Sequence, residues 1–224
     1  MLKCSSRRII DVGAARRCSL TTEPDQKENP TMPTLTVIIG STRPGRAGLP
    51  IAQWFIGRAI AHGAFDVRVV DLAELNLPFL DEPNHPRLRQ YVHQHTKDWS
   101  AIVDSSDAFV IVTPEYNYGL SAPVKNAIDF LNQEWMDKPI GFVSYGGIAA
   151  GTRAVQQLKQ IVTTLKMLPV FESVNIPFYS QFIDEEGEVQ ANDIMVQAAS
   201  AMLDELVRTE SALRQLRSDR QSAP

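Results

Sequence analysis

The 224-residue chain is long enough for one domain with a full hydrophobic core, because 44% of its residues are hydrophobic. Its formal net charge of -4 does not indicate binding to nucleic acid or to an anionic membrane surface, and no apolar run approaches the roughly 18–20 residues that span a bilayer. The only cysteines, Cys4 and Cys18, precede the first predicted strand, which excludes a disulfide framework and a thiolate-metal site from the folded part.

Residues 1–33 differ in composition from the rest of the chain. Basic residues greatly outnumber acids in the first 20, with serine and other small residues between them. This composition is typical of a transit peptide, here with processing after Cys18 and a location in the mitochondrial matrix. The alternative is a disordered extension of a cytoplasmic protein, with translation starting at Met32. The domain is expected over residues 34–217, followed by a polar tail at 218–224.

A strand, a loop rich in glycine and hydroxyl groups, and a helix are predicted in succession. The apolar run at 34–39 is typical of a strand buried on both faces, and helical spacing of apolar residues begins near Gly48. The loop between them carries Ser41, Arg43 and Arg46. Backbone N–H groups, the helix dipole and arginine forks make such a loop suitable for a phosphate. The alternative is an ordinary strand-to-helix turn with two solvated arginines.

The type of phosphate follows from what this loop lacks. It has no Gly-Lys-Ser/Thr ending, so no lysine is available for the β- and γ-phosphates of a nucleoside triphosphate. It also lacks the Gly-x-Gly-x-x-Gly pattern of dinucleotide-binding proteins. A loop with hydroxyl groups and no lysine is suited to the single terminal phosphate of a mononucleotide.

Strands and helices alternate through the rest of the chain. Further strands are expected at 65–71, 107–113, 139–145 and 168–176, and further helices at about 88–105, 122–131, 151–165 and 193–216, with a loop at 72–84. Alternation of this kind predicts an α/β fold, a five-stranded parallel sheet with helices on both faces. With right-handed crossovers, the usual strand order is 2-1-3-4-5, which places its switch point between the first and third strands.

Three loops then lie side by side beyond the carboxyl ends of the strands, where such sheets bind ligands: Ser41–Ala47, Pro114–Gly119 and Tyr145–Gly151. The second loop can flank a flat heteroaromatic ring, and the glycines of the third let backbone approach it closely. Taken separately, Tyr116 and Tyr118 could be interface aromatics, and the glycine pair could be a helix entry. Together, the loops predict one phosphate site next to one site for a polar ring.

Three motifs resemble the NAD(P)H-dependent FMN reductase family of flavodoxin-like proteins: GSTRPGR, TPEYNYGLSAPVKNAID and SYGGIAAGTRAVQQLK. The resemblance covers about residues 34–176, and the middle motif is specific. It implies a flavodoxin-like three-layer sandwich with FMN at the switch point. The family is usually dimeric, which implies a homodimer or a dimer of dimers with residues 125–129 near the subunit contact.

The resemblance also implies roles for individual residues. The FMN phosphate would be held by Ser41, Arg43 and Arg46, the isoalloxazine lined by Pro114, Glu115, Tyr116 and Asn117, and its other polar edge faced by Tyr145, Gly146 and Gly147. The chain departs from the family pattern in two places. Arg46 stands where many relatives have serine, so its side chain could point elsewhere. Tyr118 occupies a variable position and could gate the ring face.

The implied reaction passes a hydride from NADPH or NADH to bound FMN, and then to a quinone, azo, metal-oxyanion or free-flavin acceptor. The cofactor carries this chemistry, so no catalytic side chain and no metal site are expected. His93 and His95 are expected on different faces of a helix, as solvated surface residues. Two other functions stay open: an FMN-binding redox sensor that docks to a partner protein and, less favoured, a phosphate-loop hydrolase. The absence of a cysteine nucleophile from the core argues against the phosphatase version of the hydrolase.

Overall fold

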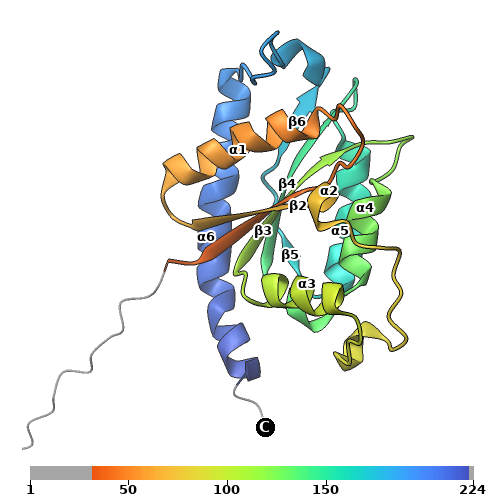
Figure 1. Ribbon diagram of the computed structural model, residues 1–224. Helices are drawn as coiled ribbons and strands as arrows, with labels where there is room; N and C mark the ends of the chain where they lie inside the picture. Colours follow the sequence, from red (N-terminus) through yellow and green to blue (C-terminus); the bar gives the residue numbers. More distant parts are fainter. Residues whose placement is uncertain (1–31, 222–224) are drawn as a thin grey trace, which may run out of the picture. The chain divides into compact units, whose positions relative to one another are not determined.

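The computed structural model describes residues 32–221 and has a parallel sheet with helices on both faces (Figure 1). Its strands are β1 Thr34–Ile39, β2 Asp66–Asp71, β3 Ala108–Pro114, β4 Pro139–Gly146, β5 Leu168–Pro169 and β6 Val174–Pro177. The order β2-β1-β3-β4-β5 confirms the predicted flavodoxin-like topology. The predictions made for residues 1–31 and 222–224 fall outside the described residues.

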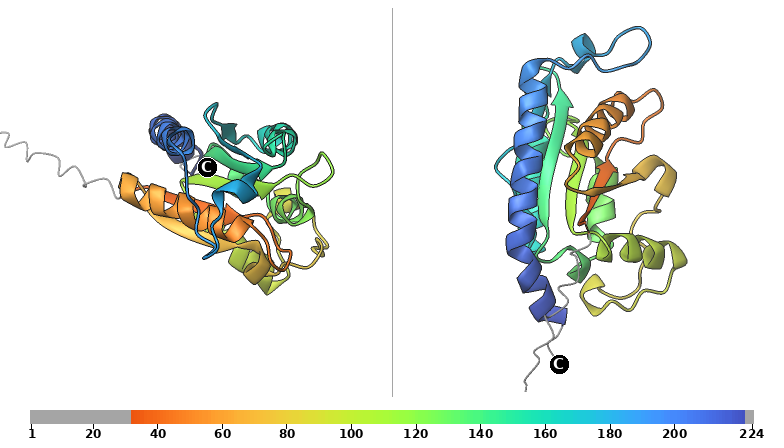
Figure 2. Two further views of the ribbon diagram at one scale, coloured as in Figure 1. Left: turned by 90° about the horizontal axis from the view of Figure 1, so that it is seen from above. Right: turned by 90° about the vertical axis from the view of Figure 1, so that its left-hand side faces the viewer.

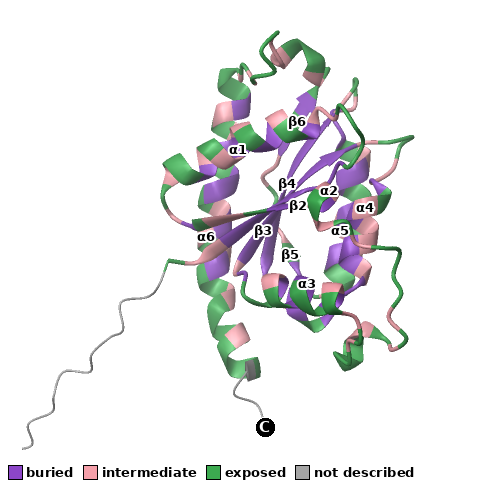
Figure 3. Ribbon diagram, in the orientation of Figure 1, coloured by how far each residue is buried: buried purple, intermediate pink, exposed green. Residues whose placement is uncertain are grey.

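Alternating side chains of the strands build two cores, one on each face of the sheet. Helices α1 (Gly48–His62) and α6 (Asp193–Gln221) cover the face to which Val37, Val110 and Val143 point. Helices α3 (Gln94–Asp104), α4 (Ala122–Asp129) and α5 (Thr152–Thr164) cover the opposite face. Figure 2 shows α6 and α3 on opposite sides of the sheet, and Figure 3 shows that the central strands are buried along most of their length. Strands buried on both faces are typical of parallel sheets.

The fifth predicted strand, at 168–176, is divided into β5 and β6. Both pair with β4, at its beginning and at its end respectively. The N–H groups of Leu168 and Val170 donate to the carbonyls of Lys138 (3.1 Å) and Ile140 (3.0 Å), and the chain then leaves the sheet until Val174 pairs with Val143. The prediction of one continuous strand was therefore wrong, because a run of apolar residues does not reveal where the ladder is interrupted.

The segment between β2 and α3 differs from its prediction in two respects. The loop expected at 72–84 begins with a short helix, α2 (Leu72–Leu75), and the helix expected from residue 88 begins only at Gln94. The carboxylate of Glu82 accepts hydrogen bonds from the Val92 N–H (2.8 Å) and the His93 N–H (3.1 Å), which holds this stretch in a non-helical path. Only a 3₁₀ turn, η1 (Pro86–Leu88), forms inside it.

The prediction that His93 and His95 face different ways was also wrong. His93 is the N-cap of α3 rather than a residue within it. The two rings stack with their centroids 5.2 Å apart, and His95 Nε2 lies 3.0 Å from Asp81 Oδ1. The reason is the later start of the helix, which gives His93 an extended backbone and brings its ring alongside that of His95.

The amino-terminal edge of the sheet is closed by paired charges. Buried Glu210 of α6 accepts hydrogen bonds from Arg214 (2.6 Å) and from Arg217. Arg217 also donates to Asp107 Oδ1 (3.2 Å), and the other oxygen of Asp107 accepts from the Thr34 N–H (2.8 Å). Helix α6 continues to Gln221, past the predicted end at residue 216. This network ties the last helix to the beginnings of β1 and β3.

Buried Lys138, which directly precedes β4, completes this edge. Its Nζ donates to the carbonyls of Val103 (2.7 Å) and Asp104 (2.9 Å), at the carboxyl end of α3. Burial lowers the pKa of Lys138 to about 8. Two further 3₁₀ turns, η2 (Gln133–Trp135) and η3 (Tyr179–Phe182), complete the secondary structure of residues 32–221. None of the helices in this range is long and apolar enough to cross a membrane.

Candidate functional site

The first predicted loop, residues 41–47, connects the end of β1 to the first turn of α1. Ser41 is fully buried, and its Oγ makes no hydrogen bond of good geometry. A Cβ atom on Gly48 would lie 2.1 Å from Ser41 Oγ and 2.4 Å from the Tyr145 hydroxyl oxygen. Glycine at this position therefore lets the helix begin directly against both hydroxyl groups. Buried polar atoms without partners are rare, so the Ser41 hydroxyl is available for a ligand.

The two arginines of this loop have different environments. Arg46 donates from Nη1 to Asp71 Oδ1 (2.6 Å), from Nη2 to Asp71 Oδ2, and from Nη1 to the carbonyl of Ser41. Arg43 is exposed and has no ion pair within residues 32–221. The structure thus engages Arg46 inside the protein and leaves Arg43 as the unpaired cation of the loop.

Asp71, which the sequence did not single out, organises this loop from the end of β2. Its carboxylate also accepts from the Ala73 N–H (2.9 Å), as the N-cap of α2. Burial acts to raise the pKa of Asp71, but the hydrogen bonds from Arg46 and Ala73 outweigh it, and the pKa lies below its ordinary value. Position at a strand end was the only sequence signal for this residue.

The second loop is a tight turn between Tyr116 and Gly119. Two backbone hydrogen bonds close it, from the Tyr116 N–H to the Gly119 carbonyl (3.0 Å) and from the Gly119 N–H to the Tyr116 carbonyl (2.9 Å). Asn117 and Tyr118 both have positive φ, of 51° and 68°. Two left-handed central residues define a type I′ turn. Asparagine tolerates this conformation well, whereas tyrosine rarely adopts it.

Helix α5 holds the second loop from outside. The Glu115 carboxylate accepts from the backbone N–H of Arg153 (3.1 Å) and from its Nη1 (2.8 Å), and the guanidinium carbon of Arg153 lies 3.9 Å from the centre of the Tyr118 ring. Gln157 donates to the Tyr118 carbonyl (3.3 Å) and accepts from the Leu120 N–H (3.1 Å). The loop is therefore attached to α5 on both sides of its turn.

The third loop, at the end of β4, meets the second through its backbone. The Glu115 N–H donates to the Tyr145 carbonyl (3.3 Å). Burial raises the pKa of Tyr145 to about 12, although the adjacent Ser41 hydroxyl acts to lower it. A Cβ atom on Gly146 would lie 3.1 Å from the Gly151 nitrogen, whereas one on Gly147 would meet nothing within 4 Å. Gly147 therefore borders open space.

The three loops converge on one cleft of about 210 Å³. It is lined by Arg43, Arg46, Ala47, Pro114, Glu115, Tyr116, Tyr145, Gly146, Gly147 and Tyr179. Of the predicted site residues, only Ser41 and Asn117 are absent from this lining. Ser41 is buried beneath it, and Asn117 lies in the turn beyond it. Tyr179 was missed because it comes from η3, after a segment without a regular pattern.

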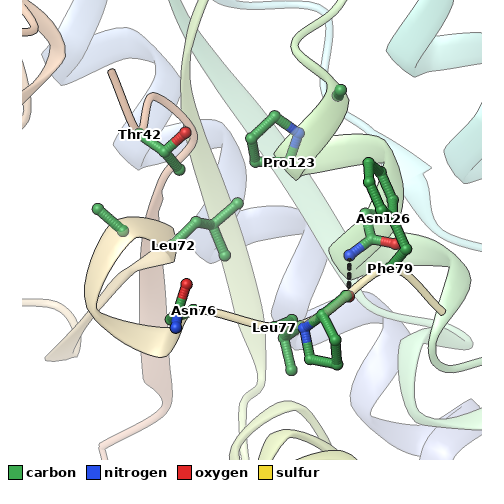
Figure 4. A pocket seen from close by; sticks show the side chains of 10 residues that line it. Thr42, Leu72, Asn76, Leu77, Phe79, Pro123 and Asn126 are labelled. Atoms are coloured by element: carbon green, nitrogen blue, oxygen red, sulfur yellow. Dashed lines mark hydrogen bonds between the residues drawn. The ribbon is translucent and has the colours of Figure 1, made fainter. Parts of the chain in front are cut away.

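A second, larger cavity of about 520 Å³ is formed by α2, the loop that follows it and α4, with Thr42 of the first loop (Figure 4). Its lining is mainly apolar and uncharged: Thr42, Leu72, Ala73, Asn76, Leu77, Pro78, Phe79, Ala122, Pro123 and Asn126. The Asn126 amide donates to the Pro78 carbonyl (2.7 Å) and accepts from the Leu80 N–H (3.1 Å). These two bonds join α4 to the loop that follows α2. Among the residues that line this cavity, only Thr42 comes from the first predicted loop.

The residues of the smaller cleft fit the nucleotide that the resemblance implies. A buried hydroxyl without a partner at Ser41 and an unpaired cation at Arg43 suit a terminal phosphate at the beginning of α1. The open space beside Gly147 leaves room for a flat ring between the second and third loops. Arg46 is the predicted phosphate ligand that fits least, because Asp71 and Ser41 already accept from its guanidinium.

The family model of the NADPH-dependent FMN reductases matches residues 33–181. An NAD(P)H-dependent FMN reductase of Schizosaccharomyces pombe is 40% identical over 149 residues, which cover 65% of this chain and 74% of that protein. An NAD(P)H:quinone oxidoreductase of Solanum tuberosum is 40% identical over 62 residues, which cover 26% of this chain and 32% of that protein.

Among solved structures, the flavoenzyme FerB, an NAD(P)H:acceptor oxidoreductase from Paracoccus denitrificans, has the same fold. Its TM-score is 0.64 at 19% identity, and the match covers 80% of this chain and 98% of that one. The family match confirms the prediction of an oxidoreductase that uses FMN and NAD(P)H. From the match over residues 33–181, the chain belongs to the NADPH-dependent FMN reductase family.

Proposed function

We propose that the cleft at the carboxyl edge of the sheet holds FMN, with its phosphate at Ser41 and Arg43 and its ring between the second and third loops. The observation that carries this proposal is that an unpaired arginine and the open space at Gly147 meet in one cleft, with the buried Ser41 hydroxyl beneath its lining. Arg46 supports the phosphate loop from beneath, through its bonds to Asp71 and Ser41.

When bound, FMN supplies the hydride chemistry, accepting from NAD(P)H and donating to a second substrate. The residues of the chain bind and orient the ring. The backbone N–H groups near Gly146 and Gly147 would donate to its polar edge, where charge develops on reduction. No side chain of the cleft is assigned a proton transfer. Pro114 and Tyr116 would line one side of the ring.

A neutral, planar acceptor of the quinone class suits this cleft best. Tyr116 of the lining is exposed, the exposed Ile148 directly follows Gly147 in the chain, and the exposed Phe178 donates from its N–H to the Gly147 carbonyl (3.2 Å). The two other arginines, Arg46 in the cleft lining and Arg153 behind it, are both paired with carboxylates. An oxyanion acceptor would therefore find no unpaired cation once Arg43 holds the phosphate.

We also propose a homodimer that uses the α4 face, where Lys125 pairs with Asp129 (2.5 Å) at the predicted subunit contact. The larger cavity lies against the same helix and is bordered by exposed Phe79. We infer a cytoplasmic location, with the mitochondrial matrix as the alternative if residues 1–18 act as a transit peptide. Size-exclusion chromatography with light scattering tests the dimer, and N-terminal sequencing from cells tests the location.

The test of function begins with an absorption spectrum of the purified protein and a titration with FMN. Steady-state oxidation of NADPH and NADH is then measured with a quinone, an azo dye, chromate and free flavin as separate acceptors. We expect FMN binding and the fastest turnover with the quinone. A protein that is reduced once and then stops would be a redox sensor instead, and a protein without flavin affinity would overturn the proposal.

A further inference from the structure

Glu115 performs an unusual task for a residue that lines the cleft. Helix α5 begins after Gly151, which has no side chain to cap it. The carboxylate of Glu115 takes over this role, because one oxygen accepts from the backbone N–H of Arg153 and the other accepts from its guanidinium. Only 9% of the Glu115 side chain is exposed, so its charge is held within the protein.

Arg153 has a second contact that links it to the turn at the tip of the second loop. Its guanidinium stacks on the ring of Tyr118 at 3.9 Å, a distance at which a cation is attracted to an aromatic face. Tyr118 holds a left-handed backbone, with φ of 68°, that tyrosine rarely adopts. The contact with Arg153 therefore stabilises the turn, although a tyrosine side chain disfavours the backbone conformation that Tyr118 has there.

We propose that Glu115 and Arg153 are a positioning pair that fixes the second loop against the third and balances the charge beside the flavin ring. This inference rests on the proposed function, because it assigns the pair a role toward FMN in the same cleft. Glu115 lines the cleft, whereas Arg153 lies behind it at the first turn of α5. Neither residue is expected to transfer a proton or a hydride.

The two halves of the pair have opposite electrostatic effects. Reduction adds negative charge to the ring, and charges act more strongly inside the protein than in water. Glu115→Gln keeps an amide in place of the carboxylate but leaves Arg153 without its negative partner, which favours reduced FMN. Arg153→Gln leaves the carboxylate without its positive partner, which disfavours reduced FMN. If the pair only packed the loop in place, the two substitutions would not shift the preference for reduced FMN in opposite directions.

The test measures the dissociation constants of oxidised and of reduced FMN for the wild type, both single variants and the double variant. We expect the ratio of the oxidised to the reduced constant to rise about tenfold in Glu115→Gln and to fall about tenfold in Arg153→Gln. A tenfold change in this ratio corresponds to about 30 mV for a two-electron couple. In the double variant the ratio should return to within about threefold of the wild type.

Two further variants separate charge from position. Arg153→Lys keeps the positive charge but cannot both bind the Glu115 carboxylate and stack on the Tyr118 ring as arginine does. Oxidised FMN should therefore bind several-fold more weakly, while the ratio of the oxidised to the reduced dissociation constant stays unchanged. Arg208→Gln is the control, because Arg208 forms an ion pair with Glu205 (2.7 Å) at an exposed position of α6, and it should leave both constants unchanged. Circular dichroism confirms that each variant is folded.

The outcomes distinguish this proposal from the proposed function. If the wild-type protein does not bind FMN, both the proposed function and the positioning pair are overturned. If the wild-type protein binds FMN, but Glu115→Gln and Arg153→Gln leave the ratio unchanged or shift it in the same direction, only the positioning pair is overturned. If Arg153→Gln does not fold, the test depends on Glu115→Gln, and an unchanged ratio in that variant then overturns the pair.

Discussion

The two edges of the sheet differ in how their polar groups are satisfied. At the amino-terminal edge, Glu210, Arg217 and Asp107 form one network, and the Lys138 ammonium has two carbonyl partners. At the carboxyl edge, the hydroxyl of Ser41 is buried without a partner, Arg43 has no counterion within the described range, and Gly147 borders open space. Within the described residues, the charged groups named at the first edge all have partners, whereas the Ser41 hydroxyl and the Arg43 guanidinium at the second edge do not.

This contrast teaches that stability and binding are separated along the strands. Buried, mutually paired charges contribute to folding only while every partner remains, because an uncompensated charge is costly. Groups left unpaired lower stability slightly but are ready to bind. Substitutions at the amino-terminal edge should therefore change unfolding more than FMN affinity, and substitutions in the cleft should do the reverse.

The largest effect is expected from Gly147→Val. Its φ is not positive, and a Cβ atom there meets nothing within 4 Å, so the variant should fold. The added side chain would occupy the space assigned to the ring, and FMN binding should be lost. Gly57→Val is the matched control, since Gly57 also has no atoms within 4 Å of a Cβ but lies at an exposed position of α1. Flavin fluorescence titration measures both, and full retention by Gly147→Val would remove the third loop from the site.

Arg217→Ala should give the next largest effect, at the opposite edge. The buried carboxylate of Glu210 loses one of its two arginines, and Asp107 loses its link to α6. We expect a loss of about 3 kcal/mol in the free energy of unfolding, toward the lower end for a broken buried pair because Arg214 remains. Urea unfolding measures this loss. FMN affinity of the folded variant should match the wild type, and a large drop would show that the two edges are coupled.

Arg43→Ala should weaken FMN binding by about 2 kcal/mol, roughly 30-fold, the expected size for a charged hydrogen bond. Stability without ligand should stay the same, because Arg43 is exposed and forms no ion pair within residues 32–221. Isothermal titration gives the affinity, with riboflavin as the comparison ligand because it lacks the phosphate. The variant and the wild type should bind riboflavin equally, and equal FMN binding would exclude Arg43 from the phosphate site.

Asp71→Asn should give the smallest effect, about 1 kcal/mol in the free energy of unfolding near neutral pH. The pKa of Asp71 is lower in the folded state than its ordinary 3.8, so the ionised carboxylate stabilises the fold. That contribution is complete above the ordinary value and is lost as the pH falls through the lower folded-state pKa. Urea unfolding of both proteins from neutral to acidic pH should show curves that converge in acid, and a constant gap would contradict this role.

The sequence predicted what depends on local pattern. Apolar runs located the central strands, and the alternation of strands and helices predicted the sheet order that the structure has. The three loops were found because parallel strands bring their carboxyl ends to one edge. Eight of the ten predicted site residues line the same cleft: Arg43, Arg46, Pro114, Glu115, Tyr116, Tyr145, Gly146 and Gly147.

What the sequence could not predict depends on partners far away in the chain. Arg46 is engaged by Asp71, 25 residues later, and Glu115 by Arg153, 38 residues later. No local spacing rule connects such pairs, so side chains expected to face the ligand are bound by the protein itself. The division of the last strand into β5 and β6 also depends on a distant partner, because β5 pairs with the beginning of β4 and β6 pairs with its end.

The contacts of Asp107 indicate where a linker can be attached to the enzyme. One of its oxygens accepts from Thr34 at the start of β1, and the other accepts from Arg217 near the end of α6. Both ends of the described chain therefore emerge at the edge of the sheet opposite the cleft. An electrode linker or a fluorescent fusion attached after Gln221 should leave the mouth of the cleft accessible to diffusing substrates.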